Sequence, residues 1–492
     1  MKQPFAALVG LIGMIGTCLP ALGQETPGAN SAGGNPPVSS EAGQLPTEGG
    51  DRGGYVATAA DCMSCHVGAD GKTLSGGKYI GTPIGRILSP NITPSRSHGI
   101  GNYTRADLER VLRDGRSPRG HLYPAMPYPS YKGMTDADID ALYAWLMAQP
   151  AVDRDPQGET DLPFPFNFRF LMAFWNVLEN RTPTHAADAG PEVARGQYLV
   201  DHLGHCGTCH TPRNGLMGAD RDRYLAGGGV IDGWITPNIT SHPVSGIGAW
   251  GRDGIVNYLR DGHAMHAAVA GGPMQEVVHY STSNMTNEDL GAMAAYLLTV
   301  PPLETPGQTQ PALVPPDQRP PPVHAYGQIR QEMAAALART DLTEPERLYV
   351  TQCAACHGVT GQGQPEAYYP PLRDTVAARR ADPVNLIRVI VEGVPSGTPY
   401  RAPGMPGFRN DLSDDQIAQV TNHVRAAFGG QAGSALTAQD VQAALNVQPR
   451  MSFLIRHAGA LAWTGILVVL ALIAALVVWI LRRRRATRLQ EA

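Results

Sequence analysis

Three copies of one short cysteine motif constrain this sequence more than any other feature. Each copy places two cysteines three positions apart, with a histidine directly after the second, in the pattern C-x-x-C-H. The copies use six of the seven cysteines in the 492-residue chain. Their first cysteines are 144 and 147 residues apart, which predicts three tandem units of similar size. The motif residues are Cys62, Cys65 and His66 in the first unit, Cys206, Cys209 and His210 in the second, and Cys353, Cys356 and His357 in the third.

This motif is typical of covalent haem c attachment. Two thiols about one helical turn apart can bond the two vinyl groups of one haem, and the adjacent imidazole then serves as the proximal iron ligand. Disulfides suit a secreted chain but do not explain the histidines. Redox C-x-x-C motifs occur in a βαβ context that the sequence lacks, and zinc needs four ligands, whereas these pairs lie far apart. The sequence therefore predicts three covalently bound haem c groups.

A methionine at a repeated position is the predicted second iron ligand in each unit. In every unit a helix with charged residues ends in a glycine, and a methionine follows that glycine by 11 or 12 residues. A thioether ligand completes six-coordination and raises the reduction potential of the iron. Met265 competes with Met274 in the second unit, but it follows its glycine by only three residues. The predicted ligands are Met126, Met274 and Met405.

Helix-start signals follow each of these methionines. Each signal is a serine or threonine three residues before an acidic or amide side chain, which is the pattern of a helix N-cap. The pairs are Thr135 with Asp138, Thr286 with Asp289, and Ser413 with Gln416. The fold class that we expect is mainly α, with three tandem units and a C-terminal transmembrane helix.

Residues 1–23 have the pattern of a secretory signal peptide. Lys2 precedes an apolar stretch, and small residues occupy the −3 and −1 positions of a cleavage site. The apolar run is short for a membrane anchor, and Thr17 fits poorly before a lipoprotein site at Cys18. We expect Cys18 to be removed with the signal, and residues 24–50 to form a disordered leader.

Residues 458–481 form a stretch of 24 uncharged residues near the other end of the chain. At about 1.5 Å per residue a helix of this length extends about 36 Å, enough to cross a hydrocarbon core of about 30 Å. Trp463 and Trp479 lie near its two ends, and arginines occupy positions 482–485. Because positive charge marks the cytoplasmic side, we expect a single pass through the inner (cell) membrane. The haem units then lie on the periplasmic side and residues 482–492 form a cytoplasmic tail.

The charge of the segment between the two ends argues against a nucleic-acid partner. Without Lys2, the five arginines after residue 481 and Glu491, the sequence keeps 33 basic and 42 acidic residues, a net charge of −9. Phosphate binding requires a basic face. We therefore expect no nucleic-acid partner.

Four further motifs carry a resemblance to a known family. They are Ser89-Pro90-Asn91-Ile92-Thr93 with Gly99-Ile100-Gly101, Thr236-Pro237-Asn238-Ile239-Thr240 with Gly246-Ile247-Gly248, and the segments 122–128 and 369–372. With the haem motifs, residues 53–429 resemble the cytochrome c subunit of the membrane-bound, quinone-linked dehydrogenases of acetic acid bacteria, which oxidise alcohols, aldehydes, gluconate or sugars. The third unit lacks the Pro-Asn-Ile-Thr loop. The C-terminal span differs from the peripheral segment of many relatives, and it favours the aldehyde dehydrogenase complexes.

The resemblance implies that each unit is a small helical cytochrome c domain. Between the first two units, residues 162–178 hold five of the nine phenylalanines and could dock a partner, lie on the membrane or pack against the flanking units. The expected division is 51–150 for domain 1, 151–189 for an aromatic connector, 190–302 for domain 2, 303–338 for a Pro-rich linker, 339–429 for domain 3, 430–457 for a tether and 458–481 for the span.

The function that we expect is electron transfer from a periplasmic dehydrogenase subunit, with alcohol or aldehyde oxidation favoured, to membrane ubiquinone. No nucleotide or flavin fingerprint stands out, and no cysteine remains for an iron–sulfur cluster. We therefore assign no catalytic residue and expect substrate oxidation on a large partner subunit of pyrroloquinoline quinone, molybdenum or flavin type, with a small third subunit. A self-contained haem peroxidase or nitrite reductase would need an open iron position. A subunit that feeds a terminal oxidase or another periplasmic reductase stays the alternative.

Overall fold

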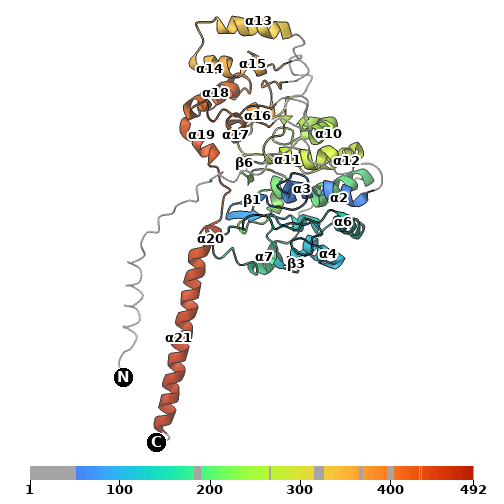
Figure 1. Cartoon of the computed structure of the whole chain (residues 1–492). Helices are drawn as coiled ribbons and strands as arrows, with labels where there is room; N and C mark the ends of the chain where they lie inside the picture. The colour runs from blue at the N-terminus through green and yellow to red at the C-terminus, as the bar shows by residue number, and fades with distance from the viewer. Residues whose placement is uncertain are drawn as a thin grey trace, which may run out of the picture. The chain divides into compact units, whose positions relative to one another are not determined.

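The computed structural model describes residues 51–181, 190–264, 268–314, 326–364, 369–395, 404–431, 433 and 435–490. The expected signal peptide and leader, residues 1–50, lie outside the described residues. Within the described part the chain is mainly α-helical, and its strands form short two-stranded antiparallel hairpins (Figure 1). The prediction of a mainly helical fold is confirmed.

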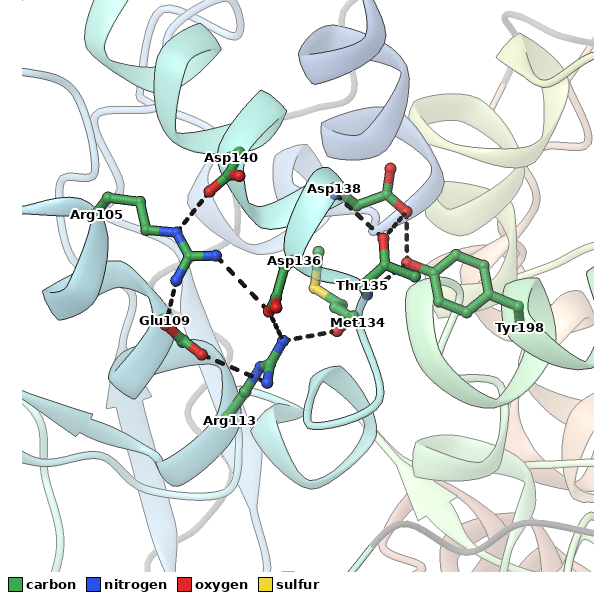
Figure 2. Close-up of polar contacts among 9 residues, drawn as sticks. All are labelled: Arg105, Glu109, Arg113, Met134, Thr135, Asp136, Asp138, Asp140 and Tyr198. Atoms are coloured by element: carbon green, nitrogen blue, oxygen red, sulfur yellow. Dashed lines mark hydrogen bonds and ion pairs between the residues drawn. The ribbon is translucent and has the colours of Figure 1, made fainter.

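The first unit contains five helices and two hairpins within residues 51–150. They are α2 (Arg52–Ala59), α3 (Cys62–His66), β1 (Tyr79–Thr82), β2 (Gly85–Leu88), α4 (Arg105–Asp114), β3 (Arg116–Ser117), β4 (Gly120–His121), α5 (Tyr128–Tyr131) and α6 (Asp136–Ala148). Ion pairs join α4 to the start of α6: Arg113 contacts Asp136 at 2.5 Å, and Arg105 contacts Asp140 at 2.6 Å (Figure 2). Helix α7 (Leu171–Glu179) follows in the connector.

The second unit repeats this order. Its helical elements are α8 (Pro191–Gln197), the π-helix η2 (Tyr198–Leu203), α9 (Gly207–His210), η3 (Arg221–Arg223), η4 (Gly248–Trp250), α10 (Gly251–Asp261), α11 (Pro273–Tyr280), η5 (Thr282–Asn284) and α12 (Asn287–Leu297). Its hairpins are β5 (Val230–Ile231) with β6 (Trp234–Ile235), and β7 (His263–Ala264) with β8 (Ala268–Val269).

Helices are the main elements in the rest of the described chain. Its helices are α13 (Tyr326–Leu337), α14 (Glu344–Gln352), α15 (Ala354–His357), α16 (Val376–Arg379), α17 (Val384–Glu392), α18 (Asp414–Ala427), α19 (Ala438–Leu445), α20 (Phe453–Arg456) and α21 (Ala458–Gln490).

The predicted helix starts are confirmed at all three repeated positions. Each capping side chain accepts a hydrogen bond from the backbone N–H three residues later, which satisfies a group that the helix leaves unpaired. The caps are Thr135 of α6, Thr286 of α12 and Ser413 of α18. The helix before each predicted methionine ends in a glycine of positive φ, a conformation that favours glycine: Gly115 at 59°, Gly262 at 69° and Gly393 at 78°.

The first two units share one hydrophobic core, and the third has its own. Leu142 and Trp145 of α6 belong to the same buried cluster as Tyr296 and Leu297 of α12. A separate cluster, which includes the fully buried Ile417 of α18, holds the third unit together. The first two units therefore exclude water from a common interior, which fixes them as one body.

Three segments that we expected to connect the units contain helices. The range 303–338, expected as a Pro-rich linker, includes α13, and Met333 of that helix packs against the third core. The range 430–457, expected as a tether, includes α19, whose Val441 and Ala444 are buried in the same core. Helix α7 in the aromatic connector buries none of its residues.

One helix in the described residues is long and apolar enough to cross a membrane. It is the part of α21 from Ala458 to Arg485, with a mean hydropathy of 2.9 in its most apolar window and none of that window buried. An apolar helix whose most apolar window is left unburied by the described residues is suited to a lipid environment. This helix indicates membrane anchoring.

Candidate haem-binding sites

Each cysteine motif folds as a single short helical turn. Helix α3 contains the whole first motif, and α9 and α15 begin directly after the first cysteine of theirs. Residues three apart in a helix lie on the same face, so each turn presents both thiols together. All six motif cysteines are free thiols, so the disulfide alternative finds no support.

The three motif histidines are held in the same way. In each, the ring Nδ1 lies within hydrogen-bond distance of a proline carbonyl oxygen. The pairs are His66 with Pro90 at 2.9 Å, His210 with Pro237 at 2.7 Å, and His357 with Pro370 at 2.8 Å. Because a carbonyl oxygen only accepts, Nδ1 carries the proton and Nε2 keeps its lone pair for a metal. Burial lowers the pKa of all three histidines, which favours this neutral form.

The repeated Pro-Asn-Ile-Thr loop positions two of these carbonyls. The side chain of Asn91 accepts hydrogen bonds from the backbone N–H and the hydroxyl of Thr93, at 2.8 and 2.7 Å. Asn238 and Thr240 repeat both distances in the second unit. This side-chain turn fixes the backbone around the preceding proline. The third unit lacks the loop and supplies Pro370 from another one. The histidine partners were not predicted from the sequence, although the repeated motif marked two of them.

The motif thiols are partly buried. Burial raises the pKa of Cys62, Cys65, Cys206 and Cys353 to about 12, and that of Cys209 to about 11. Zinc binds thiolates and needs four ligands. The part of the chain that the structure describes contains no cluster of three or more His, Cys, Asp or Glu able to hold a metal ion. The free thiol pairs and oriented imidazoles fit haem c, and the zinc alternative finds no support.

The hairpins place Met126 and Met274 at equivalent positions. Met126 lies five residues after β4, and Met274 lies five residues after β8. Met265 lies outside the described residues. Met405 differs, because its backbone pairs directly with Val394 through two hydrogen bonds of 2.9 Å. Each methionine is partly buried against the same core as the first cysteine of its motif. The ligand role of these methionines stays a prediction.

The first two motifs lie close together. The Tyr131 hydroxyl donates a hydrogen bond of 2.6 Å to the carbonyl of Ala60, two residues before Cys62. The ring of Tyr131 also lies edge-on to that of His205, the residue before Cys206, with centroids 5.5 Å apart. Tyr131 therefore contacts residues just before both motifs.

A partly buried ion pair makes a second connection between these two sites. Lys78 of the first unit donates a hydrogen bond of 2.9 Å to the carbonyl of Ser64, inside the first motif. The same ammonium pairs with Glu276 of α11, two residues after Met274. Burial alone would lower the pKa of Lys78, but the charge and hydrogen bond of Glu276, with smaller contributions from Cys65 and Asp232, raise it. Such a pair fixes the relative position of the two sites, since breaking it would leave a buried charge uncompensated.

Comparisons with known families agree with these sites. The family model described as Cytochrome c matches residues 51–150 and 193–301. The model described as cytochrome c oxidase, cbb3-type, subunit III matches residues 340–424.

Similar proteins of known function cover most of the chain. The fructose dehydrogenase cytochrome subunit of Gluconobacter japonicus is 37% identical over 452 residues, which is 88% of this chain and 91% of the relative. The cytochrome c subunit of alcohol dehydrogenase (quinone) from Gluconacetobacter polyoxogenes is 38% identical over 79% of this chain and 82% of the relative. The gluconate 2-dehydrogenase cytochrome c subunit of Pantoea cypripedii is 36% identical over 79% of this chain and 88% of the relative.

Proposed function

Because this chain belongs to the cytochrome c subunits of quinone-linked dehydrogenases, we propose that it carries electrons from a periplasmic dehydrogenase subunit to ubiquinone in the membrane. The observation that carries this proposal is the close approach of the first two motifs around Tyr131 and Lys78. Two redox groups in one rigid core can exchange electrons with little rearrangement of the protein. Alcohol or aldehyde is the favoured substrate of the partner.

The chain's own residues would hold three haem c groups. The six motif cysteines would bind them covalently, and the three histidines, through Nε2, and Met126, Met274 and Met405 would be the iron ligands. When bound, haem c supplies one-electron transfer between ferric and ferrous iron. A histidine and a methionine on each iron leave no position for a substrate, so these residues support electron transfer rather than a peroxidase or a nitrite reductase.

Substrate oxidation then belongs to a large partner subunit with pyrroloquinoline quinone, a molybdenum cofactor or a flavin, with a small third subunit in the complex. Helix α21 supports a single membrane pass, and the arginines at 482–485 support periplasmic haem units. In that arrangement the complex meets a water-soluble substrate through the partner subunit and a lipid-soluble quinone in the membrane.

A second candidate is a subunit that feeds a terminal oxidase. The similarity of residues 340–424 to subunit III of cbb3-type oxidases favours it, but that match covers the third unit alone.

Re-oxidation of the purified complex separates the two candidates. The full complex would be reduced by its substrate without oxygen, and the haem absorbance followed after addition of a ubiquinone analogue. We expect rapid re-oxidation of the haem, and none with the solvent alone. Re-oxidation by oxygen but not by the quinone analogue would favour the oxidase candidate.

A further inference from the structure

Residues 303–313, which we call the exit segment, leave the second unit but are bonded to it at both ends. At the first end, the N–H of Leu303 donates a hydrogen bond of 3.2 Å to the hydroxyl of Thr240. At the other end, Leu313 is only 1% exposed and belongs to the core that the first two units share. The exit segment is therefore fixed on the second unit.

The third unit docks on the middle of the exit segment. The side-chain amide of Gln308 donates to the carbonyl of Arg379 at 3.1 Å and accepts from the N–H of Ala381 at 2.8 Å. The side chain of Arg379 donates in turn to the carbonyl of Pro311 at 2.9 Å. Gln308 is buried, and a buried amide without partners is costly. The exit segment and the third unit therefore hold one relative position.

Asn238 connects the exit segment to the second haem-binding site. Its side-chain Nδ2 donates to the carbonyl of Leu303 at 2.6 Å and to the hydroxyl of Thr305 at 3.3 Å. Its Oδ1 accepts from the N–H and the hydroxyl of Thr240. Asn238 is only 1% exposed, so its amide would lose these bonds without replacement by water if the exit segment moved. The position of Asn238 thus follows that of the exit segment.

The position of Asn238 in turn sets the carbonyl that orients the motif histidine. The carbonyl of Pro237 and the nitrogen of Asn238 belong to one planar peptide unit, and this carbonyl lies 2.7 Å from Nδ1 of His210. A hydrogen bond at Nδ1 makes the other ring nitrogen a more basic ligand. A more basic ligand stabilises ferric iron more than ferrous iron. Weakening of the bond should therefore raise the reduction potential.

The first unit contains the same arrangement with a different continuation. Asn91 donates to the carbonyls of Val152 and Arg154 at 2.8 and 3.1 Å. The hydroxyl of Thr93 accepts from the N–H of Val152 at 3.1 Å. The segment that leaves the first unit continues into the aromatic connector. The two copies therefore differ in what their exit segments lead to.

We propose that Asn238 is a positioning residue that couples the docking of the third unit to the reduction potential of the haem held by Cys206 and Cys209. The inference rests on the proposed haem at that motif. Displacement of the third unit moves the exit segment, Asn238 moves with it, and the hydrogen bond between Pro237 and His210 weakens. The potential of the second haem then depends on whether the unit that holds the third haem is docked.

The test is a spectroelectrochemical titration of the full, haem-loaded chain. Gln308→Met keeps the length of the side chain and removes both of its bonds to the third unit. Thr240→Val and Thr93→Val each remove the hydroxyl from one loop, so they identify the potentials of the second and first haems. Gln328→Ala is the matched control, because it removes an exposed hydrogen bond within α13.

We expect Thr240→Val to shift the reduction equilibrium of one haem about tenfold toward the reduced form, which is 59 mV for one electron. Thr240→Ser keeps the hydroxyl and should restore most of the original potential. Gln308→Met should shift the same haem in the same direction by about threefold. Gln328→Ala should shift none.

A folded Gln308→Met chain with full haem content and three unchanged potentials would overturn the inference. A shift in Gln308→Met of the haem that Thr93→Val identifies would do the same. If Gln308→Met does not fold, Gln308→Glu keeps the acceptor for Ala381 and removes the donor. Its negative charge favours the oxidised form, so a raised potential in that variant supports the coupling, and an unchanged or lowered one contradicts it. Absence of haem from the Cys206 motif of the unmodified chain, measured by peptide mass, would instead overturn the proposed function at this site.

Discussion

The Tyr198 hydroxyl donates a hydrogen bond of 2.6 Å to the carboxylate of Asp138, across the contact between the second unit and the first (Figure 2). The equivalent contact runs in the opposite direction, because Tyr55 of the first unit donates to Asp289 of the second at 2.5 Å. Each aspartate lies in the first turn of its helix, α6 or α12. The two units therefore use the same surface against each other, as the subunits of a two-fold symmetric dimer do.

An arginine from its own unit supports each aspartate. Arg52 contacts Asp138 at 2.8 Å, and Arg195 contacts Asp289 at 2.7 Å. Each aspartate carboxylate therefore pairs with an arginine of its own unit and accepts a hydrogen bond from a tyrosine of the other unit.

Removal of these hydroxyls should weaken the contact between the units. We expect Tyr55→Phe and Tyr198→Phe each to cost about 1.5 kcal/mol of unfolding free energy, since each loses a hydrogen bond to a charged group. Denaturant unfolding of the haem-loaded chain would measure the loss. Tyr143→Phe is the control, because that hydroxyl donates to the carbonyl of Tyr103 within the first unit. Hydrogen exchange would show where each variant loses protection. Equal loss of protection at the contact between the units in all three variants would contradict the assignment of Tyr55 and Tyr198 to that contact.

The same contact should weaken in acid. Burial alone would raise the pKa of Asp289, but hydrogen bonds from Arg195 and Tyr55 and the charge of Arg195 lower it below the ordinary 3.8. The unfolded chain therefore binds the proton first as the pH falls. The stabilisation is complete well above pH 3.8 and is lost as the pH falls through the lower pKa of the folded state. The stability difference between the unmodified chain and Asp289→Asn should shrink from pH 6 to pH 3. Arg195→Gln should reduce that pH dependence, and a difference that grows in acid would contradict this account.

Local signals predicted much of this fold, and contacts between distant residues could not be predicted. The caps at Thr135, Thr286 and Ser413 depend on side chains three residues away, so a single sequence reveals them. A comparable local signal, Thr437 with Asp440, starts α19 inside the range that we expected to be a tether. By contrast, Tyr198 and Asp138 are 60 residues apart, and no local pattern pairs them.

The residues of the candidate sites also fall into those that local signals predict and those that they do not. The cysteines and histidines follow from their spacing, whereas the proline carbonyls that orient the histidines come from loops 13 to 27 residues away.

Removal of one motif should remove one haem. With Cys353→Ala and Cys356→Ala together, we expect the haem stain of the chain on a denaturing gel to fall by about one third, because thioether bonds survive denaturation. Equal protein loading and the corresponding Cys62 and Cys65 variant are the controls. Undiminished stain in the Cys353 and Cys356 variant would refute three covalent haems.

Substitution of the predicted second ligand should open one iron in the second unit. Met274 occupies the position after β8 that Met126 occupies after β4, so we expect Met274→Leu to lower one haem potential and to let one haem per chain bind carbon monoxide when reduced. Met265→Leu is the matched control and should leave the spectrum unchanged. If Met265→Leu changes the spectrum and Met274→Leu does not, the second iron ligand is Met265 instead.

Two apolar features could hold the protein at a membrane. Helix α21 is one, and the aromatic connector is the other, with Phe168, Phe170 and Phe174 exposed by 45%, 58% and 68%. The ring of Phe164 contacts that of Trp463, with centroids 5.0 Å apart, so the connector reaches the start of the helix. The two contributions can be separated by truncation.

A chain that ends before Ala458 should leave the membrane and keep its redox sites. The cysteine motifs and both hydrophobic cores lie before that residue, so we expect unchanged haem content and unchanged electron uptake from the dehydrogenase partner in solution. Quinone reduction by membranes should fall, because a span of uncharged residues contributes far more to anchoring than a few exposed rings. Fractionation with a salt wash measures the anchoring, and the full-length chain with Phe170→Ser and Phe174→Ser is the control that should stay bound. If the truncated complex also stays bound after the wash, the aromatic connector is the main anchor, and the two serine substitutions in the truncated chain should then release it.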